Sequence, residues 1–433
     1  MSFPKHSITT LSNNIKILWI PVKNSKSVGV SVTIDAGFFE EKNNQIGLAH
    51  FLEHMIARNL KDGPIMKKLR DKGIIVESNA QTSNFRTMYH AHADSTHYID
   101  IIKLVLRAYN HRVIDKNLFE SEKNAVIVEM KKKMIDAENI ANYKELPVMM
   151  FGSKTKMKID PMEHIKIVKQ STPQDLIDYM TSNYQAGRTV ITVSGNYNKT
   201  QSLKLLKKEL EKIPKSQKLP MRVIKGVTTG LFPKIKYVAD KKRKVTKLSL
   251  IFKCFDSSHE EKKYAVKLMS NILFRIGDKS ILFNRLRTRL GVAYSPYAIN
   301  SFYPQFGVFA FKVDVEPKNI EITLKELSLI IKELRSQLVP TNLIKLAKSR
   351  AKFDIKESLY NINPTRYFSY SNKVLDEEPI VNPETLYQEF YSKYNAGHIK
   401  KIAKEVFKKN KCYLTLVGNN SLSNTKLRNL LDF

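Results

Sequence analysis

The sequence predicts an α+β fold with mixed α/β layers, in which two homologous, duplicated domains each carry a mostly antiparallel sheet covered by helices. Two segments show the duplication. Ser-Asn-Tyr-Gln-Ala-Gly at 182–187 returns as Ser-Lys-Tyr-Asn-Ala-Gly at 392–397, and Thr-Val-Ser-Gly-Asn at 192–196 returns as Thr-Leu-Val-Gly-Asn at 415–419. An offset of about half the chain indicates a duplicated domain and not a solenoid. At 433 residues and 42% apolar side chains, the chain can fill two cores.

Apolar alternation and short apolar runs predict the strands of the first half, and apolar positions three to four residues apart predict its helices. Strands are expected over 15–21, 28–36, 74–80, 85–93 and 189–194, and helices over 45–58, 65–71, 95–109, 116–134, 161–168, 173–183 and 200–212. Gly73 ends the second helix, because glycine readily leaves helical geometry. The polar, proline-bearing stretch 213–220 is typical of a linker.

The second half repeats this order of elements. Strands are expected over 235–239, 245–254, 292–302 and 306–315, and helices over 260–273, 317–338, 341–360, 363–376 and the lysine-rich stretch 400–409. We therefore assign residues 1–213 to a first domain, 214–226 to a linker and 227–433 to a homologous second domain.

Composition disfavours several classes of function. No apolar run is long enough to span a bilayer, and the N-terminus has no apolar signal core or arginine-rich presequence, so we expect a cytoplasmic protein without membrane contact. The net charge of +32 would suit nucleic-acid binding. The lysines are scattered over almost every predicted helix, however, without a phosphate-binding loop or Cys/His finger spacing, so nucleic acid is disfavoured as a partner. Cys254 and Cys412 lie in strand-like apolar runs and are expected to be buried free thiols.

The most informative stretch is His-x-x-Glu-His at 50–54, inside an apolar run of helix-forming residues. On a helix His50 and His54 lie on one face, so both imidazoles can point at one metal ion. Two neutral imidazoles and the neighbouring carboxylate of Glu53 suit a catalytic zinc, provided that a third protein ligand leaves one position open for water. The order is the reverse of His-Glu-x-x-His. The motif alone leaves open an amphipathic helix with two solvated histidines.

Glu129 is the candidate for the third ligand. It lies two helical turns after Glu122 on the helix predicted over 116–134, so the two carboxylates share a face. Apolar residues between them indicate a partly buried helix, where an unpaired carboxylate is costly. Glu129 would bind the ion and Glu122 would support a ligand from behind. The alternative is a solvated acidic face paired with the neighbouring lysines, and these residues alone favour it.

Together the two stretches resemble the pitrilysin/insulysin family of zinc metallopeptidases, which includes the mitochondrial processing peptidases. That family places a glutamate ligand some seventy residues after its His-x-x-Glu-His, and a second glutamate seven residues before that ligand. Glu129 and Glu122 match both positions. Ile-Ala-Arg-Asn at 56–59 departs from the family's usual Phe-x-Gly-Thr. The resemblance implies one Zn²⁺ per chain, bound by His50, His54 and Glu129, with Glu53 as the base.

Two further segments carry the resemblance. Leu-Arg-Thr-Arg-Leu-Gly-Val-Ala-Tyr at 286–294 is similar to the family's Leu-Arg-x-x-x-Gly-x-Ala-Tyr, which implies that Arg287 and Tyr294 hold the substrate and stabilise the oxyanion. Ser-Asn-Ala-Gln-Thr at 78–82 is similar to an edge strand near the metal, which implies that Asn79 anchors a substrate carbonyl and Ala80 leaves room for the peptide. The alternatives are a surface ion pair for Arg287, a core strand position for Tyr294 and an ordinary turn asparagine.

The resemblance implies a zinc metalloendopeptidase that encloses peptides or unfolded segments in a clamshell chamber. In the family the half-length members pair, so that one half supplies the zinc site and the other supplies the Arg and Tyr. We expect a homodimer, because one chain carries both motifs; a heterodimer is the alternative. The competing functions are a catalytically inactive partner or scaffold subunit and, less favoured, a basic nucleic-acid-associated protein.

Overall fold

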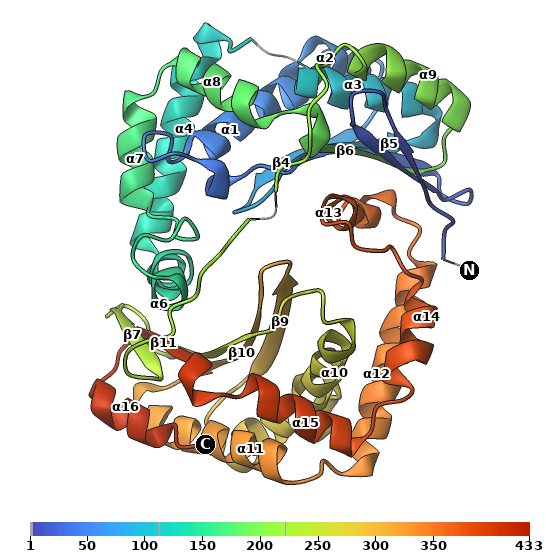
Figure 1. Ribbon diagram of the computed structural model, residues 1–433. Coiled ribbons are helices and arrows are strands. Elements are labelled where there is room, and N and C mark those ends of the chain that lie inside the picture. Colours follow the sequence, from blue (N-terminus) through green and yellow to red (C-terminus); the bar gives the residue numbers. More distant parts are fainter. Residues whose placement is uncertain (1–2, 111–112, 221) are drawn as a thin grey trace. The chain divides into compact units, whose positions relative to one another are not determined.

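The computed structural model describes residues 3–110, 113–220 and 222–433 (Figure 1). The chain divides into two compact units. Unit 1 comprises Met1–Met134, Ile159–Met221 and Leu359–Ile380, and unit 2 comprises Ile135–Lys158, Arg222–Ser358 and Val381–Phe433. Each unit contains one mostly antiparallel sheet with covering helices, so the predicted fold class is confirmed.

Unit 1 is built on a six-stranded sheet in the order β1-β2-β6-β3-β5-β4. Its strands are β1 (Ser7–Thr10), β2 (Lys16–Pro21), β3 (Ser27–Ile34), β4 (Val76–Thr82), β5 (Thr87–Asp94) and β6 (Thr189–Gly195). Only β2 and β6 run parallel, and the other neighbours are antiparallel. Nearly every residue of β3 and β6 is buried, because both faces of these central strands are covered. The sequence pattern did not predict β1, which has one large apolar side chain in four residues.

Helices cover one face of this sheet (Figure 1). They are α1 (Leu48–Asp62), α2 (Pro64–Asp71), α3 (Tyr98–Asn110), α4 (Lys116–Ile135), α7 (Pro161–Gln170), α8 (Pro173–Asn183) and α9 (Lys199–Leu210). The core between sheet and helices contains fully buried large side chains such as Trp19, Phe51 and Tyr89. This packing fixes α1 over the strands, and α1 is the helix that bears the His-x-x-Glu-His motif.

Unit 2 has a five-stranded sheet in the order β7-β11-β8-β10-β9. Its strands are β7 (Lys234–Ala239), β8 (Thr246–Cys254), β9 (Tyr297–Tyr303), β10 (Phe306–Val315) and β11 (Cys412–Gly418), and its main helices are α10 (Glu260–Ser270), α11 (Ile320–Ser336), α12 (Thr341–Tyr360), α15 (Ala396–Val406) and α16 (Asn424–Leu430). The strand predicted over 292–302 begins only at Tyr297. Gly291 has a φ of +63°, and Pro296 cannot donate a ladder hydrogen bond.

Two short helical segments are exchanged between the units: one from the first half of the chain belongs to unit 2, and one from the second half belongs to unit 1. In unit 2, α5 (Ala137–Asn139), a π-helical turn (Ile140–Glu145) and α6 (Leu146–Phe151) follow α4, and Ala137 and Ala141 pack against Val417. In unit 1, a 3-10 turn (Pro364–Tyr367) and α13 (Tyr370–Leu375) follow α12, and bury Tyr367, Val374 and Leu375 against β2 and β6. The chain passes from unit 1 to unit 2 within the predicted linker 214–226. The predicted domains over 1–213 and 227–433 are contiguous and so do not include the exchange of the two short segments.

Two other expectations from composition can be compared with the structure. Within the described ranges, no helix combines the length and apolar content needed to cross a bilayer. Cys254 and Cys412 are both buried and unpaired, as predicted.

Candidate metal centre

Helix α1 presents His50, Glu53 and His54. Gly47 occupies the position before its first residue with a φ of +94°, a conformation that glycine adopts without strain. Most of α1 is buried, and its apolar side chains pack into the core of unit 1. The two histidines lie one turn apart on the same face, with ring centres 4.7 Å apart.

Helix α4 presents Glu122 and Glu129. Phe119, Val126 and Met130 are buried and anchor this helix in the same core, and the Phe119 ring lies 5.1 Å from the Phe51 ring of α1. The prediction that α4 is partly buried is therefore confirmed. The carboxylates of Glu122 and Glu129 face α1.

Three of the predicted ligands converge. Oε2 of Glu129 lies 3.5 Å from Nε2 of His50 and 3.4 Å from Nε2 of His54. The three ligand atoms all lie within 4.8 Å of one another. A tetrahedral zinc with bonds of about 2.0–2.2 Å holds neighbouring ligand atoms about 3.3–3.5 Å apart. The donor types therefore suit a zinc ion, and both separations from Glu129 match its spacing.

The charges of His50 and Glu129 suit a cation. Burial, aided by His54, lowers the pKa of His50 to about 3, so this imidazole is neutral and able to act as a ligand. Burial also lowers the pKa of His54, but hydrogen bonds to Glu129 and Glu122 and the charge of Glu53 outweigh burial and raise it. The hydrogen bond from His54 holds the pKa of Glu129 well below its usual value, although burial opposes this. Glu129 is therefore ionised.

Glu53 lies beside the ligand set. Its Oε2 is 4.0 Å from Nε2 of His50 and accepts a hydrogen bond from Thr82 Oγ1 at 3.3 Å. Burial raises the pKa of Glu53, and His54 and Thr82 only partly offset this. A carboxylate with a raised pKa next to a metal can accept a proton and give it back.

Further charged groups surround the cluster. Oε2 of Glu122 lies 3.3 Å from Nδ1 of His54, on the side of the ring away from Glu129, as the sequence predicted for a supporting carboxylate. Lys133 Nζ lies 2.7 Å from the other oxygen of Glu129. Sequence reasoning assigned no functional role to Lys133, although its spacing of four residues from Glu129 is a usual ion-pair spacing on a helix. Sequence reasoning likewise assigned no functional role to Thr82 or His164.

Asn79 and Ala80 lie on β4, the last strand in the sheet order of unit 1. Asn79 is exposed and pairs with His90 of β5, and Ala80 pairs with Tyr89. In the described part of the chain no strand pairs with the outer side of β4, which leaves backbone groups open to an extended peptide.

Arg287 and Tyr294 lie in unit 2 and contact each other. The guanidinium of Arg287 stands 4.4 Å from the centre of the Tyr294 ring and 4.7 Å from the centre of the Phe283 ring. Tyr294 is 79% exposed, so the core-strand alternative for this residue does not apply. The stacking keeps two hydrogen-bond donors together at the surface.

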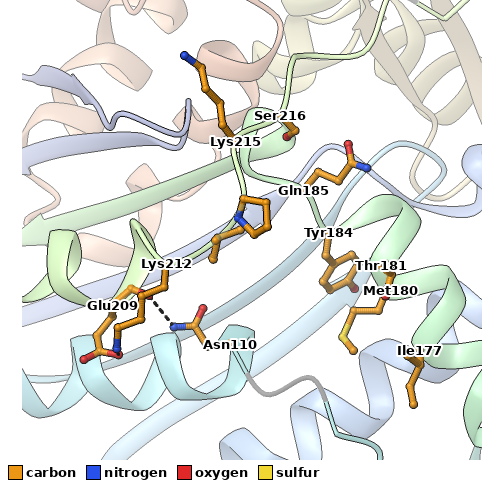
Figure 2. Close-up of a pocket in the computed structure, with 12 residues that line it drawn as sticks. Asn110, Ile177, Met180, Thr181, Tyr184, Gln185, Glu209, Lys212, Lys215 and Ser216 are labelled. Carbon is orange, nitrogen blue, oxygen red and sulfur yellow. Dashed lines mark hydrogen bonds and ion pairs between the residues drawn. The ribbon is translucent and has the colours of Figure 1, made fainter.

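A separate hollow of about 680 Å³ lies in unit 1 between the end of α3, α8 and the segment after α9 (Figure 2). At its rim Lys212 Nζ lies 3.4 Å from Oε2 of Glu209, and Asn110 donates a hydrogen bond to the Glu209 carbonyl. None of the described residues that line it is a predicted site residue. The hollow is therefore distinct from the metal centre.

Comparison with protein families identifies two matches. Residues 17–149 match the family described as Insulinase (Peptidase family M16), and residues 171–351 match the one described as Peptidase M16 inactive domain. The first range contains His50, Glu53, His54 and Glu129. Together the two ranges take in well over half of the chain.

Individual proteins are similar at lower identity. A Rickettsia felis protein named Uncharacterized zinc protease is 22% identical over 367 residues, which are 82% of this chain and 82% of that protein. Mitochondrial-processing peptidase subunit beta of Rattus norvegicus is 26% identical over 216 residues, 48% of this chain and 42% of that subunit, so the match spans less than half of its length. A solved protease from Helicobacter pylori has a TM-score of 0.83 at 20% identity, covering 96% of this chain and 100% of that chain. At this identity the structural likeness shows the fold.

Proposed function

Because the chain belongs to the M16 family of metallopeptidases, we propose that it is a zinc-dependent metalloendopeptidase with His50, His54 and Glu129 as its zinc ligands. The convergence of Glu129 Oε2 on both Nε2 atoms, at 3.5 and 3.4 Å, carries this proposal. Three protein ligands are the usual number in catalytic zinc sites, where the fourth position is kept for water or substrate.

Zinc bound there would lower the pKa of water and polarise the substrate carbonyl. Glu53 accepts a proton from the attacking water and passes it to the leaving amine. Its raised pKa helps the first of these transfers, because it makes the carboxylate a stronger base, and the hydrogen bond from Thr82 fixes one of its oxygens. Glu122 holds His54 through Nδ1, so that Nε2 of that ring stays directed at Glu129.

Arg287 and Tyr294 are proposed as donors to the oxyanion that forms at the attacked carbonyl. Their mutual stacking and the exposure of Tyr294 support this role. In the proposed homodimer each chain supplies this pair to the zinc site of the other, and the two chains enclose the peptide as a clamshell. A heterodimer with a different subunit is the alternative arrangement.

The substrate is proposed to bind as an added strand along β4. Asn79 would anchor one of its carbonyls, and the small side chain of Ala80 would leave room for the peptide backbone. The position of β4 at the end of the sheet supports this. The cytoplasmic location stays a prediction.

One observation favours a second candidate, an inactive partner subunit. The range 171–351 matches a family described as an inactive domain. That range excludes His50, Glu53, His54 and Glu129, however, and these four residues lie together with the spacing and charge a catalytic zinc site requires. We therefore favour the peptidase.

Replacing the base tests this choice. Glu53→Gln should keep zinc bound, because Glu53 is not a ligand, and should lower peptide hydrolysis about 10²–10⁴-fold. Zinc content by atomic absorption and cleavage of an unfolded protein would be measured in parallel. Glu120→Gln, an exposed glutamate of α4 paired with Lys123, is the control and should behave as the wild type. Equal hydrolysis by Glu53→Gln and wild type would refute the catalytic role, and a zinc-loaded wild type without hydrolysis would favour the inactive partner.

A further inference from the structure

The two candidate histidine ligands differ in what lies behind them. The Nδ1 atom of His54 has a partner, Oε2 of Glu122 at 3.3 Å. The Nδ1 atom of His50 is buried and has no hydrogen-bond partner among the described residues. If Nε2 of His50 binds the metal, the ring proton sits on Nδ1, and a buried N–H without an acceptor is costly. Histidine ligands of metals almost always donate this proton to a nearby group.

A third histidine is a neighbour of the His50 ring. His164, on α7, is 1% exposed, and its ring centre lies 5.6 Å from that of His50 at an angle of 84°. Phe38 packs against both rings. Nε2 of His164 is likewise buried without a hydrogen-bond partner among the described residues. Two buried nitrogens without partners among the described residues thus belong to neighbouring rings, and one can accept the proton that the other must donate.

Gly47 makes room for this arrangement. A Cβ atom at position 47 would lie 2.3 Å from Cδ2 and 2.5 Å from Nε2 of His164. The Nε2 edge of His164 therefore points at the start of α1, less than one turn before His50. Helical side chains lean back over the preceding turn, so the His50 ring covers this same region.

We propose that Nε2 of His164 accepts the N–H proton at Nδ1 of His50 and thereby fixes the orientation of that zinc ligand. A direct bond of about 2.9 Å between two imidazole nitrogens corresponds to ring centres about 5 Å apart. The observed 5.6 Å is close to this separation, and the proposed bond forms when the rings turn Nδ1 of His50 toward Nε2 of His164. His164 is a positioning residue, because it acts on the metal through His50. This inference rests on the proposed function, since it assumes that zinc binds the cluster.

A pair of variants of similar size separates hydrogen bonding from packing. His164→Asn keeps an acceptor in the pocket, and His164→Leu fills a similar volume without one. His90→Leu is the control: His90 has a buried Nδ1 without a partner among the described residues, but it lies on β5, where it pairs with Ser31 and Asn79. Each full-length protein would be titrated with zinc against a chromophoric chelator, and the cobalt-substituted forms compared by visible absorption.

The expected result is a zinc dissociation constant about 10–100-fold higher for His164→Leu, with His164→Asn and His90→Leu close to the wild type. The cobalt spectrum should change only for His164→Leu. Equal zinc affinity of His164→Leu and His164→Asn overturns the inference, whether both are normal or both are weakened. If the wild type binds zinc and cleaves peptides while the variants match it, the proposed function stands and this inference fails. A wild type that binds no zinc would remove both.

Discussion

The two units repeat one strand order, with different side chains at the helix pair that forms the candidate metal centre in unit 1. β2-β6-β3-β5-β4 of unit 1 corresponds to β7-β11-β8-β10-β9 of unit 2, and each has its single parallel pair in the same place. In each unit a 20-residue helix comes after the last antiparallel strand pair and one further helix: α4 after α3, and α12 after α11. Counted from the first residue of each helix, Glu122 corresponds to Ala347 and Glu129 to Asp354.

The contacts made at these aligned positions differ. In unit 1 the carboxylates of α4 face two imidazoles. In unit 2 Asn271, just after α10, donates a hydrogen bond to the Ala347 carbonyl, and Arg275 Nη2 lies 3.0 Å from Asp354 Oδ2. A guanidinium stays protonated and cannot bind a metal. In each unit a carboxylate therefore faces the helical segment that follows β3 or β8, and the residue opposite it decides whether a metal can bind.

The largest expected effect is that of removing the carboxylate of Glu129 in unit 1, with removal of the matching carboxylate in unit 2 as the control. Glu129→Gln should abolish zinc binding at micromolar zinc and with it hydrolysis, because one of three protein ligands is lost. Asp354→Asn, at the matching position of unit 2, should leave zinc content and cleavage unchanged. Atomic absorption and a peptide assay on both variants measure this. Retention of zinc by Glu129→Gln would end the assignment of this ligand.

Unit 2 is expected to contribute to turnover without touching the metal. Tyr294→Phe should lower kcat about 10²–10³-fold, the usual cost of losing one oxyanion donor, while the zinc content stays normal. Tyr360→Phe, another exposed tyrosine, is the control. Steady-state kinetics with a fluorogenic peptide give the values. An unchanged kcat for Tyr294→Phe would limit catalysis to unit 1.

A smaller effect is expected for the carboxylate behind His54. Glu122→Gln should raise the zinc dissociation constant about 10–100-fold, because the amide orients the ring less strongly than an ionised group. Glu120→Gln, on the same helix and paired with Lys123, should have no effect. Chelator competition distinguishes the two. Similar affinities for both variants would make Glu122 a packing residue.

The smallest effect is expected at the ion pair that takes the place of the cluster in unit 2. Arg275→Ala should lower the free energy of unfolding by about 1 kcal/mol or less, since both partners are partly exposed and solvent screens the pair. Urea denaturation of wild type and variant measures the change. A loss of several kcal/mol would mean that this pair, unlike its counterpart, has a structural role.

Much of the fold follows from local pattern. The apolar periodicity of α3 and α11 and the apolar runs of β3, β6 and β8 identify these elements correctly, because each buries one face or both in a core. The segment after α4 was not predicted to be helical, whereas the helix predicted over 363–376 forms in part, as a 3-10 turn and α13. For neither segment does the local sequence indicate which sheet an apolar face such as that of Ala137 and Ala141 will cover.

The residues of the candidate site also fall into those that local spacing predicts and those that only tertiary packing brings together. His50, Glu53 and His54 come from one helix, so their spacing is enough to bring them together. Glu129 arrives from a helix far along the chain, and only the resemblance to a family pointed to it. Thr82 and His164 reach the cluster from β4 and α7 through tertiary packing. No spacing rule relates them to the motif, so sequence alone could not single them out.

The exchanged segments make the two halves of the chain interdependent. A fragment ending at residue 213 would keep α5 and the π-helical turn without Val417, against which Ala137 and Ala141 pack, and would lack Tyr367 and Leu375, which cover its own β2 and β6. The complementary fragment, residues 214–433, would keep Tyr367 and Leu375 without β2 and β6, and it would lack Ala137 and Ala141, which pack against its own Val417. Severing the backbone in the linker should therefore yield pieces that are insoluble when expressed separately yet rescue each other when co-expressed.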